Sequence, residues 1–289
     1  MTSPQQWLGG ARPRTLPLVL SPVLVGTAAS AVGAPVIWWR MVAAGLVAVF
    51  LQVGVNYAND YSDGLRGADR YRRGPMRLTA SGVATPAAVR TAALTCFTGA
   101  AVVGLALALV VDLWLLVLGG LCIAGAWFYS GGRRPYGYSG WGEAAVLAFF
   151  GFVATVGSAY VQARSVPAAA WWGSLVVGLP ACAVLVVNNL RDIDADRQAG
   201  KRTLAVRMGP TATRQLFIAL LVGAMAAVIP IGLEHPTAFI AFVAVALAVD
   251  PARCLSHEAN ASSLTRSLTG TVRLAFVTSA LLSLGLALA

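Results

Sequence analysis

The chain has 289 residues, of which 58% are hydrophobic and only 11% are charged, and its formal net charge is +10. Soluble domains usually carry charge on about a quarter of their residues, so this composition excludes an ordinary soluble protein and indicates an integral membrane protein. A basic chain is also typical of nucleic-acid binders, but here the Arg residues are spread between apolar runs instead of forming one basic face, so we predict no nucleic-acid partner.

Apolar runs long enough to cross a bilayer recur along the whole chain. A run of about 20 residues can span as a helix, because hydrocarbon offers the backbone no hydrogen-bond partner but itself. We count nine, at 16–33, 36–57, 86–111, 113–131, 143–163, 170–190, 213–233, 236–253 and 268–288. The links that begin at Gly33, Asp112 and Glu234 are short, whereas the stretches 58–85 and 191–212 are long and polar. The sequence therefore predicts one all-α membrane domain over residues 1–289, with its function in the long loops.

The basic residues indicate how the chain is oriented. If nine segments cross the bilayer, all of the 21 Lys and Arg residues except Arg40 and Arg164 fall on one side. Because basic residues accumulate in cytoplasmic loops, we expect a multi-pass protein of the cell (plasma) membrane, with a cytoplasmic N-terminus and the C-terminus outside. The first segment also resembles a signal peptide, since Arg12 and Arg14 precede an apolar run that ends in small residues. Cleavage there would leave the other loops on the same sides.

Acidic residues are concentrated in two clusters. The first cluster follows the second apolar segment and contains Asp60, Asp63 and Asp69. The second follows the sixth apolar segment and contains Asp192, Asp194 and Asp196. Four crossings separate the clusters, so both should lie at the same membrane face. Each cluster begins with Asn-x-x-x-Asp, from Asn56 and from Asn188, and this spacing places each set along one helical face.

Clustered carboxylates at a membrane require compensation, because each costs about 2.5–3.5 kcal/mol at a helix centre. Carboxylate and amide oxygens are ligands that suit Mg²⁺, which usually joins a few carboxylates to phosphate oxygens. Neither cluster has a histidine or cysteine nearby, which disfavours zinc and iron. Basic residues surround both clusters, namely Arg66, Arg70, Arg72, Arg73, Arg77, Arg191, Arg197, Lys201 and Arg202. The combination indicates a Mg²⁺–diphosphate site, although each Arg is also explained by cytoplasmic location alone.

Several segments resemble the UbiA-type intramembrane aromatic prenyltransferases, and the similarity covers nearly the whole chain. The two acid clusters match the family's Asp-rich motifs, as NYANDYSDGLRGAD followed by GPMRLTASG and as NNLRDIDADRQAGKRTLAVRMG. The stretch RRPYGYSGWGE resembles a cytoplasmic loop of the family, at about 132–142, and ARPRTLPLVLSPVLVG resembles its first helix. One departure is Gly67, which stands where a longer form of the first motif has a third Asp, so that Asp69 is displaced by two positions.

The resemblance implies a ring of nine transmembrane helices around a cavity that opens to the cytoplasm and laterally to lipid. It implies Mg²⁺ ions bound by Asp60, Asp63, Asp192 and Asp196, which would hold the donor's diphosphate. Lys201 and Arg77 would neutralise the departing diphosphate, and Lys201 is counted with the four acids as catalytic. The remaining residues expected to bind substrate are Asn56, Asn59, Asp69, Tyr136, Tyr138, Asn188 and Arg202.

The form of the motifs also implies a substrate pair. The donor would be a polyprenyl diphosphate and the acceptor 1,4-dihydroxy-2-naphthoate, which would lose CO₂ to give demethylmenaquinone. One alternative is another aromatic acceptor, such as 4-hydroxybenzoate. A second, from a different class, is a membrane transporter, because charges near the bilayer often mark transport paths.

Overall fold

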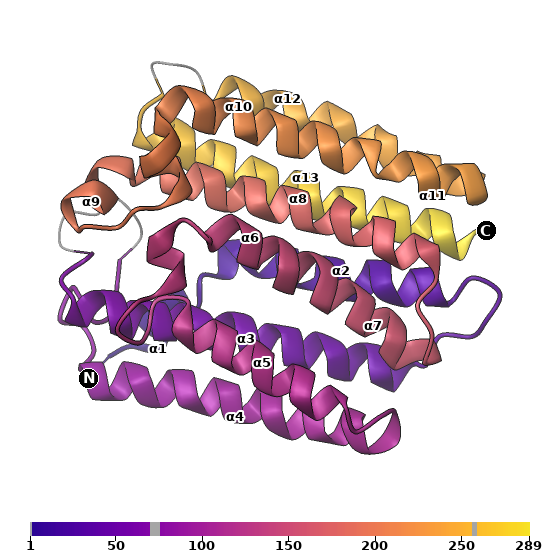
Figure 1. Cartoon of the computed structure of the whole chain (residues 1–289), viewed down its shortest axis with the longest axis horizontal. Coiled ribbons are helices and arrows are strands. Elements are labelled where there is room, and N and C mark those ends of the chain that lie inside the picture. The colour runs from indigo at the N-terminus through magenta and orange to yellow at the C-terminus, as the bar shows by residue number, and fades with distance from the viewer. Residues whose placement is uncertain (1, 70–75, 256–258) are drawn as a thin grey trace.

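The computed structural model describes residues 2–69, 76–255 and 259–289, and every regular element within them is helical (Figure 1). The α-helices are α1 Pro4–Ala11, α2 Leu16–Ser30, α3 Trp38–Leu65, α4 Pro86–Val110, α5 Leu115–Phe128, α6 Gly142–Val146, α7 Ala154–Ala163, α8 Ala168–Arg191, α9 Ile193–Gln198, α10 Leu204–Ala226, α11 Val228–Glu234, α12 Val249–Arg253 and α13 Ala261–Ala287. Three 3₁₀ segments, η1 Pro13–Thr15, η2 Tyr136–Ser139 and η4 Pro236–Ala248, and the π-helix η3 Leu147–Val153 complete the elements. The all-α expectation is confirmed. Arg70, Arg72 and Arg73 lie outside the described residues.

The helices are long and apolar enough for an integral membrane protein. In the described ranges, seven qualify as spans by length and composition: Trp38–Leu65, Pro86–Val110, Gly142–Ala163, Ala168–Arg191, Leu204–Glu234, Pro236–Arg253 and Ala261–Ala287. The two other expected segments correspond to the shorter helices α2, of 15 residues, and α5, of 14 residues. The structure thus supports seven to nine spans, and the count of nine stays a prediction.

The helices run side by side, and the chain termini lie at opposite ends of the bundle (Figure 1). Helix α8 is the most enclosed of these seven spans, because 72% of the residues in its apolar 18-residue stretch are buried inside the protein. It packs against α2, α10 and α13, and small residues such as Ser174, Ala181 and Ala183 allow these close approaches. The segment between α8 and α10, which contains α9, lies at the same end of the bundle as the N-terminus (Figure 1).

Two helix boundaries differ from the sequence expectation in ways that affect the site. Helix α3 continues to Leu65, so the first residues of the expected loop 58–85 are helical and carry Asp60 and Asp63 on a rigid element. Helix α1 was not anticipated, although Ser3 and Gln6 form a capping box at its start.

Helix α1 is held against α3 by specific contacts. The Trp7 ring packs edge-on against Tyr57 at 5.6 Å between centroids, and the Tyr57 hydroxyl donates to the Trp7 carbonyl at 2.9 Å. The side-chain amide of Asn56 donates to the Ala11 carbonyl at 3.0 Å. The N-terminal segment therefore covers the start of the first acid cluster.

A cavity of about 1140 Å³ lies within the bundle. Its walls come from α2, α3, α5, α8 and α13 and from the continuous rod formed by α6, η3 and α7. These elements lie far apart along the chain, so the cavity exists only in the assembled helix bundle.

Candidate active site

Asp60 is almost fully buried, with 1% of its surface exposed, and it organises the chain that returns after the first acid cluster. Its Oδ2 accepts from the backbone N–H of Leu78 at 2.9 Å, and its Oδ1 accepts from that of Thr79 at 3.0 Å. Both oxygens thus hold the segment that contains Arg77 against α3. Asp60 has a structural task in addition to any ligand role.

Asp63 lies one helical turn further along α3 and accepts from two side chains brought from distant parts of the chain. The Tyr138 hydroxyl donates to its Oδ1 at 2.5 Å, and the Lys201 ammonium donates to its Oδ2 at 3.0 Å. The Lys201 nitrogen also lies 4.5 Å from the centroid of the Tyr138 ring, a cation–π contact. Arg66 covers the same ring, with its guanidinium carbon 5.6 Å from the centroid.

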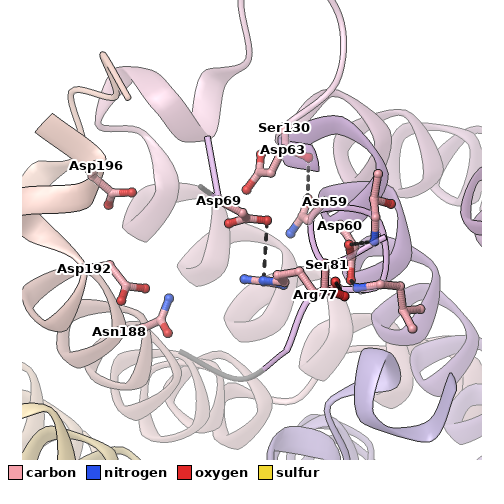
Figure 2. Close-up of polar contacts among 12 residues, drawn as sticks. Asn59, Asp60, Asp63, Asp69, Arg77, Ser81, Ser130, Asn188, Asp192 and Asp196 are labelled. Atoms are coloured by element: carbon pink, nitrogen blue, oxygen red, sulfur yellow. Dashed lines mark hydrogen bonds and ion pairs between the residues drawn. The ribbon is translucent and has the colours of Figure 1, made fainter. Parts of the chain in front are cut away.

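The position of Asp69 follows from the end of α3. Gly67 has φ +67°, a left-handed conformation that favours glycine, and it ends the helix before a third acid could continue the helical face. Asp69 is folded back and buried, where its Oδ2 lies 3.6 Å from Nε of Arg77. Asp69 and Arg77 were each expected to bind substrate, and here they form an ion pair with each other (Figure 2).

The second acid cluster surrounds the junction of α8 and α9. Asp192 is buried at this junction, and the Arg191 guanidinium contacts its carboxylate twice, at 3.0 and 2.9 Å. Arg191 also donates to Oδ1 of Asn188 at 2.7 Å. Asp196 is likewise buried, on α9, whereas the Asp194 side chain is 83% exposed and pairs with Arg197. The two buried acids are the ones expected to bind metal.

Lys201 joins the two clusters. Gly200, with φ +73°, ends the α9 turn, and the Lys201 backbone N–H then bonds back to the Asp196 carbonyl at 2.8 Å. The ammonium consequently lies 3.0 Å from Asp63 and 3.9 Å from Asp196. Figure 2 shows Asp192, Asp196 and Asn188 on the side of the site opposite to Asp60 and Asp63 of α3.

The other expected site residues differ in how far they reach the cavity. Asn56, Asn59 and Tyr136 line it; the side-chain Oδ1 of Asn59 accepts from the Ser130 hydroxyl at 2.6 Å, and the Tyr136 hydroxyl donates to the Gly125 carbonyl at 2.6 Å. Arg202 is exposed and is held through its backbone N–H, which donates to the Tyr138 carbonyl at 2.8 Å. Its role in substrate binding stays a prediction.

The two loop tyrosines are neutral hydrogen-bond donors near neutral pH. Burial raises the pKa of Tyr136 to about 12. Burial and the neighbouring Asp63 carboxylate raise the pKa of Tyr138 well above its usual value of 10. Both phenols therefore keep their protons at any pH at which the protein would work.

The polar end of the cavity is lined by residues from both clusters and from the N-terminal segment: Arg12, Arg14, Asn56, Asp60, Arg77, Asn188 and Arg191. Away from this end the lining is mainly aliphatic and aromatic, as at Leu18, Leu51, Phe149 and Phe150. An anionic head group and a long apolar tail are the two parts of a ligand that would fit these surroundings.

The donor set fits Mg²⁺ only as part of a complex with a phosphate ligand. Within the described ranges, no three acidic, histidine or cysteine side chains form a group that could hold a metal unaided. Mg²⁺ usually keeps some of its waters and binds through one or two carboxylates together with the phosphates of a substrate. The buried pairs Asp60 and Asp63, and Asp192 and Asp196, could each supply the protein ligands of such a complex. In this structure Arg191 pairs with Asp192 and Lys201 pairs with Asp63. These two basic side chains balance the carboxylate charges that a bound metal ion would otherwise balance.

Several residues of the site were not singled out by the sequence. Arg12 and Arg14 line the cavity, and the arginines of the ARPRTLP stretch were the available signal. Behind the cavity wall, buried Glu143 accepts from the side-chain amide of Asn189 at 2.9 Å. This pair joins α6 to α8, and no local pattern in the sequence indicates it.

Comparison with known proteins identifies relatives over most of the chain. The sequence model of the UbiA prenyltransferase family matches residues 19–288. A Mycobacterium tuberculosis protein named 1,4-dihydroxy-2-naphthoate octaprenyltransferase is 49% identical over 249 residues, covering 86% of this chain and 85% of that protein. A Mycobacterium leprae protein of the same name is 53% identical over 226 residues, covering 77% of this chain and 76% of that protein.

The fold is also similar to that of a solved membrane protein. A UbiA homolog from Archaeoglobus fulgidus, determined with DMAPP and Mg²⁺, superposes with a TM-score of 0.66 at 15% sequence identity. The superposition covers 96% of this chain and 99% of that one. At this low identity the similarity concerns the fold.

Proposed function

This chain belongs to the UbiA prenyltransferase family, and from that premise we propose that it transfers a polyprenyl group from polyprenyl diphosphate to 1,4-dihydroxy-2-naphthoate. The acceptor would lose CO₂ and become demethylmenaquinol, which keeps both ring hydroxyls because the reaction involves no oxidant; demethylmenaquinone is its oxidised form. The observation that carries the proposal is the meeting of two acid clusters across Lys201. Other residues of the same clusters, Asp60 and Asn188, line the polar end of a largely apolar cavity. The names of the mycobacterial relatives support this choice of acceptor.

The diphosphate end of the donor would bind between the two clusters. Asp60, Asp63, Asp192 and Asp196 would hold Mg²⁺, which stabilises negative charge on a departing diphosphate electrostatically. Lys201, Arg77 and Arg191 are the nearby cations that would bind diphosphate oxygens directly. The metal assignment is also supported by the Mg²⁺ named for the Archaeoglobus homolog.

The apolar walls would protect the reacting carbon. Breaking the allylic C–O bond leaves a cation-like carbon, which water would capture before the acceptor ring could attack it. Side chains such as Phe149, Phe150 and Tyr136 line the cavity, where they would exclude water and present π faces to positive charge. The ring carbon that bears the carboxylate then forms the new C–C bond as CO₂ leaves.

We propose that the site faces the cytoplasm. Among the described residues, few basic side chains lie at the opposite end of the bundle, which supports this orientation. Two of them are Arg40, which donates to the carbonyls of Val161 and Gln162, and Arg164, which donates to that of Val110. A cysteine placed at exposed Asp194 should resist a membrane-impermeant thiol reagent in intact cells and react after the membrane is opened. Labelling in intact cells would contradict the orientation.

The activity itself is tested with purified protein in detergent. Incubation with 1,4-dihydroxy-2-naphthoate, octaprenyl diphosphate and Mg²⁺ should give demethylmenaquinol, identified by its mass as the quinol or as its air-oxidised form, demethylmenaquinone. Chelation of divalent cations should abolish the product, and added Mg²⁺ should restore it, because uncompensated diphosphate is a poor leaving group.

Two outcomes would favour the alternatives. Product with 4-hydroxybenzoate but none with the naphthoate would reject the proposed acceptor. Movement of substrate across proteoliposomes without any chemical conversion would indicate a transporter instead of an enzyme.

A further inference from the structure

The start of α13 carries polar side chains that belong to neither acid cluster. Ser262, Thr265 and Thr269 lie on one face of this helix, at i, i+3 and i+7, and all three line the cavity. The helix begins at the end of the bundle that holds α9 and the N-terminus (Figure 1). The cavity therefore has a second polar wall at the same end as the acid clusters.

The hydroxyls of this wall are oriented by their own helix. Asn260 caps the start of α13, where its side chain accepts from the backbone N–H groups of Ser262 and Ser263. Further along, the Thr265 and Thr269 hydroxyls donate to the carbonyls four residues before them, at 2.8 and 3.1 Å. Because both hydroxyl protons are used within the helix, the two oxygens can accept hydrogen bonds from a ligand in the cavity.

The segment η1, which packs against α13, brings two arginines to the cavity. Arg12 is held in a left-handed conformation, with φ +58°, and its charge acts on the Asp60 carboxylate. Arg14 is exposed, and within the described ranges its side chain forms no ion pair and no hydrogen bond. The two arginines of this segment thus reach from the first acid cluster toward the polar wall of α13.

The other cations that line the cavity have acidic partners. Among the described residues, the basic side chains in the lining are Arg12, Arg14, Arg77 and Arg191. Arg77 pairs with an acid of the first cluster, and Arg191 pairs with an acid of the second. Cytoplasmic location alone would explain an arginine at this end, but it would not require the side chain to line a cavity. Arg14 is therefore the cation best placed to bind an anion other than the diphosphate.

We propose that Arg14 binds the carboxylate of the aromatic acceptor and that Thr265 and Thr269 accept from its ring hydroxyls, so that the acceptor site lies between η1 and α13. This inference rests on the proposed prenyl-transfer function. The acceptor is an anion, so the acid clusters repel it, and the cations beside them are used by the diphosphate. A guanidinium binds a carboxylate through two parallel hydrogen bonds.

Binding at Arg14 would distinguish the acceptor from the product. The carboxylate leaves as CO₂, so the prenylated quinol has no group for this arginine to hold. Arg14 should therefore contribute to the affinity for the acceptor and not to the affinity for the product. Because the arginine is exposed, water screens the ion pair and the contribution is modest.

Equilibrium binding of two naphthalene probes tests the carboxylate contact without turnover. The probe 1-hydroxy-2-naphthoate carries the carboxylate, whereas 1-naphthol lacks it, and the intrinsic fluorescence of each reports its binding. In Arg14→Gln the Kd of 1-hydroxy-2-naphthoate should rise by about fivefold to tenfold, and the Kd of 1-naphthol should stay at the wild-type value. Arg14→Lys keeps the charge without the two parallel hydrogen bonds, so its Kd for 1-hydroxy-2-naphthoate should be intermediate.

The matched control is Arg90→Gln. Arg90 is an exposed arginine near the start of α4, and it does not line the cavity. The same loss of charge at this position should leave both Kd values unchanged. Equal rises in Arg14→Gln and Arg90→Gln would mean that overall charge attracts the carboxylate, and they would overturn the assignment of Arg14.

Steady-state kinetics tests the hydroxyl contact on α13. Thr269→Val replaces the hydroxyl with a methyl group of similar size, so KM for 1,4-dihydroxy-2-naphthoate should rise by about threefold, with kcat and KM for octaprenyl diphosphate unchanged. Thr269→Ser keeps the hydroxyl and should retain the wild-type KM. A wild-type acceptor KM in Thr269→Val would overturn the part of the site assigned to α13.

The outcomes separate the inference from the function. No product from the wild-type protein would reject the proposed function, and the Kd values of the two probes would still decide whether Arg14 binds an aromatic carboxylate. Product from the wild-type protein, together with the same Kd for 1-hydroxy-2-naphthoate in wild type and Arg14→Gln, would overturn the acceptor site and leave the function intact.

Discussion

Replacing Asp63 with asparagine should lower kcat by about 10²–10³-fold, the usual loss when one electrostatic group of a catalytic site is removed. Asp63 is the acid that contacts both Tyr138 and Lys201, so the substitution removes its negative charge from the point where the two clusters meet. The asparagine can still accept a hydrogen bond from Tyr138, and Lys201 retains its ion pair with Asp196 at 3.9 Å, so the fold should be retained. Steady-state kinetics over a range of Mg²⁺ concentrations would measure the loss, together with a weaker apparent affinity for Mg²⁺.

The matched control is Asp194→Asn. Asp194 belongs to the same acid-rich stretch as Asp192 and Asp196, but its side chain is exposed and pairs with the exposed Arg197, so turnover should stay near the wild-type value. Equal losses in both variants would indicate that overall charge, and not the geometry at Asp63, controls activity. Full activity in Asp63→Asn would remove this residue from the site.

Replacing Asp60 with asparagine should abolish turnover and also destabilise the protein by about 1–3 kcal/mol, the cost of leaving a buried polar group unpaired. The two Asp60 oxygens accept from the N–H groups of Leu78 and Thr79, whereas an asparagine offers one oxygen and one NH₂ group. One backbone N–H would then face a donor. The midpoint of thermal unfolding should fall, and hydrogen exchange at Leu78 and Thr79 should accelerate.

Comparison with Asp63→Asn separates the two roles of Asp60. The structural role predicts a loss of protection in the segment after residue 76 only for the Asp60 variant. Lost turnover with unchanged exchange at Leu78 and Thr79 would mean that Asp60 acts in the chemistry alone and that its backbone contacts contribute nothing to stability.

The general architecture could be predicted because it depends on local patterns. An apolar run such as 170–190 must be helical in a bilayer whatever its neighbours are, and the Asn56–Asp60 spacing fixes one face of α3. The family resemblance carried by the motifs is confirmed, and so are the all-α fold and the membrane location. Orientation, the number of spans and the roles of individual site residues stay predictions.

Contacts between distant residues could not be predicted in the same way. Lys201 reaches Asp63 across 138 positions, and only the assembled bundle brings the segment after α9 to the end of α3. The ion pair between Asp69 and Arg77 follows a left-handed turn at Gly67. Helical spacing along the sequence does not predict where the chain goes after such a turn. The structural role of Asp60, in addition to its expected role as a metal ligand, could not be predicted either. Its partners are backbone N–H groups, which every residue except proline carries.

The sequence by itself determined which segments are apolar, that two acid clusters lie an even number of crossings apart, and that the residue types suit Mg²⁺ and diphosphate. These properties belong to neighbouring residues and to helical periodicity. The tertiary structure decided that Lys201 stands between the clusters, that Arg202 is exposed and does not line the cavity, and that Leu107 and Val161 line one cavity although they lie far apart in the sequence. Those properties depend on how the helices pack, because a cavity is the space that several helices leave between them and no single segment encodes its depth.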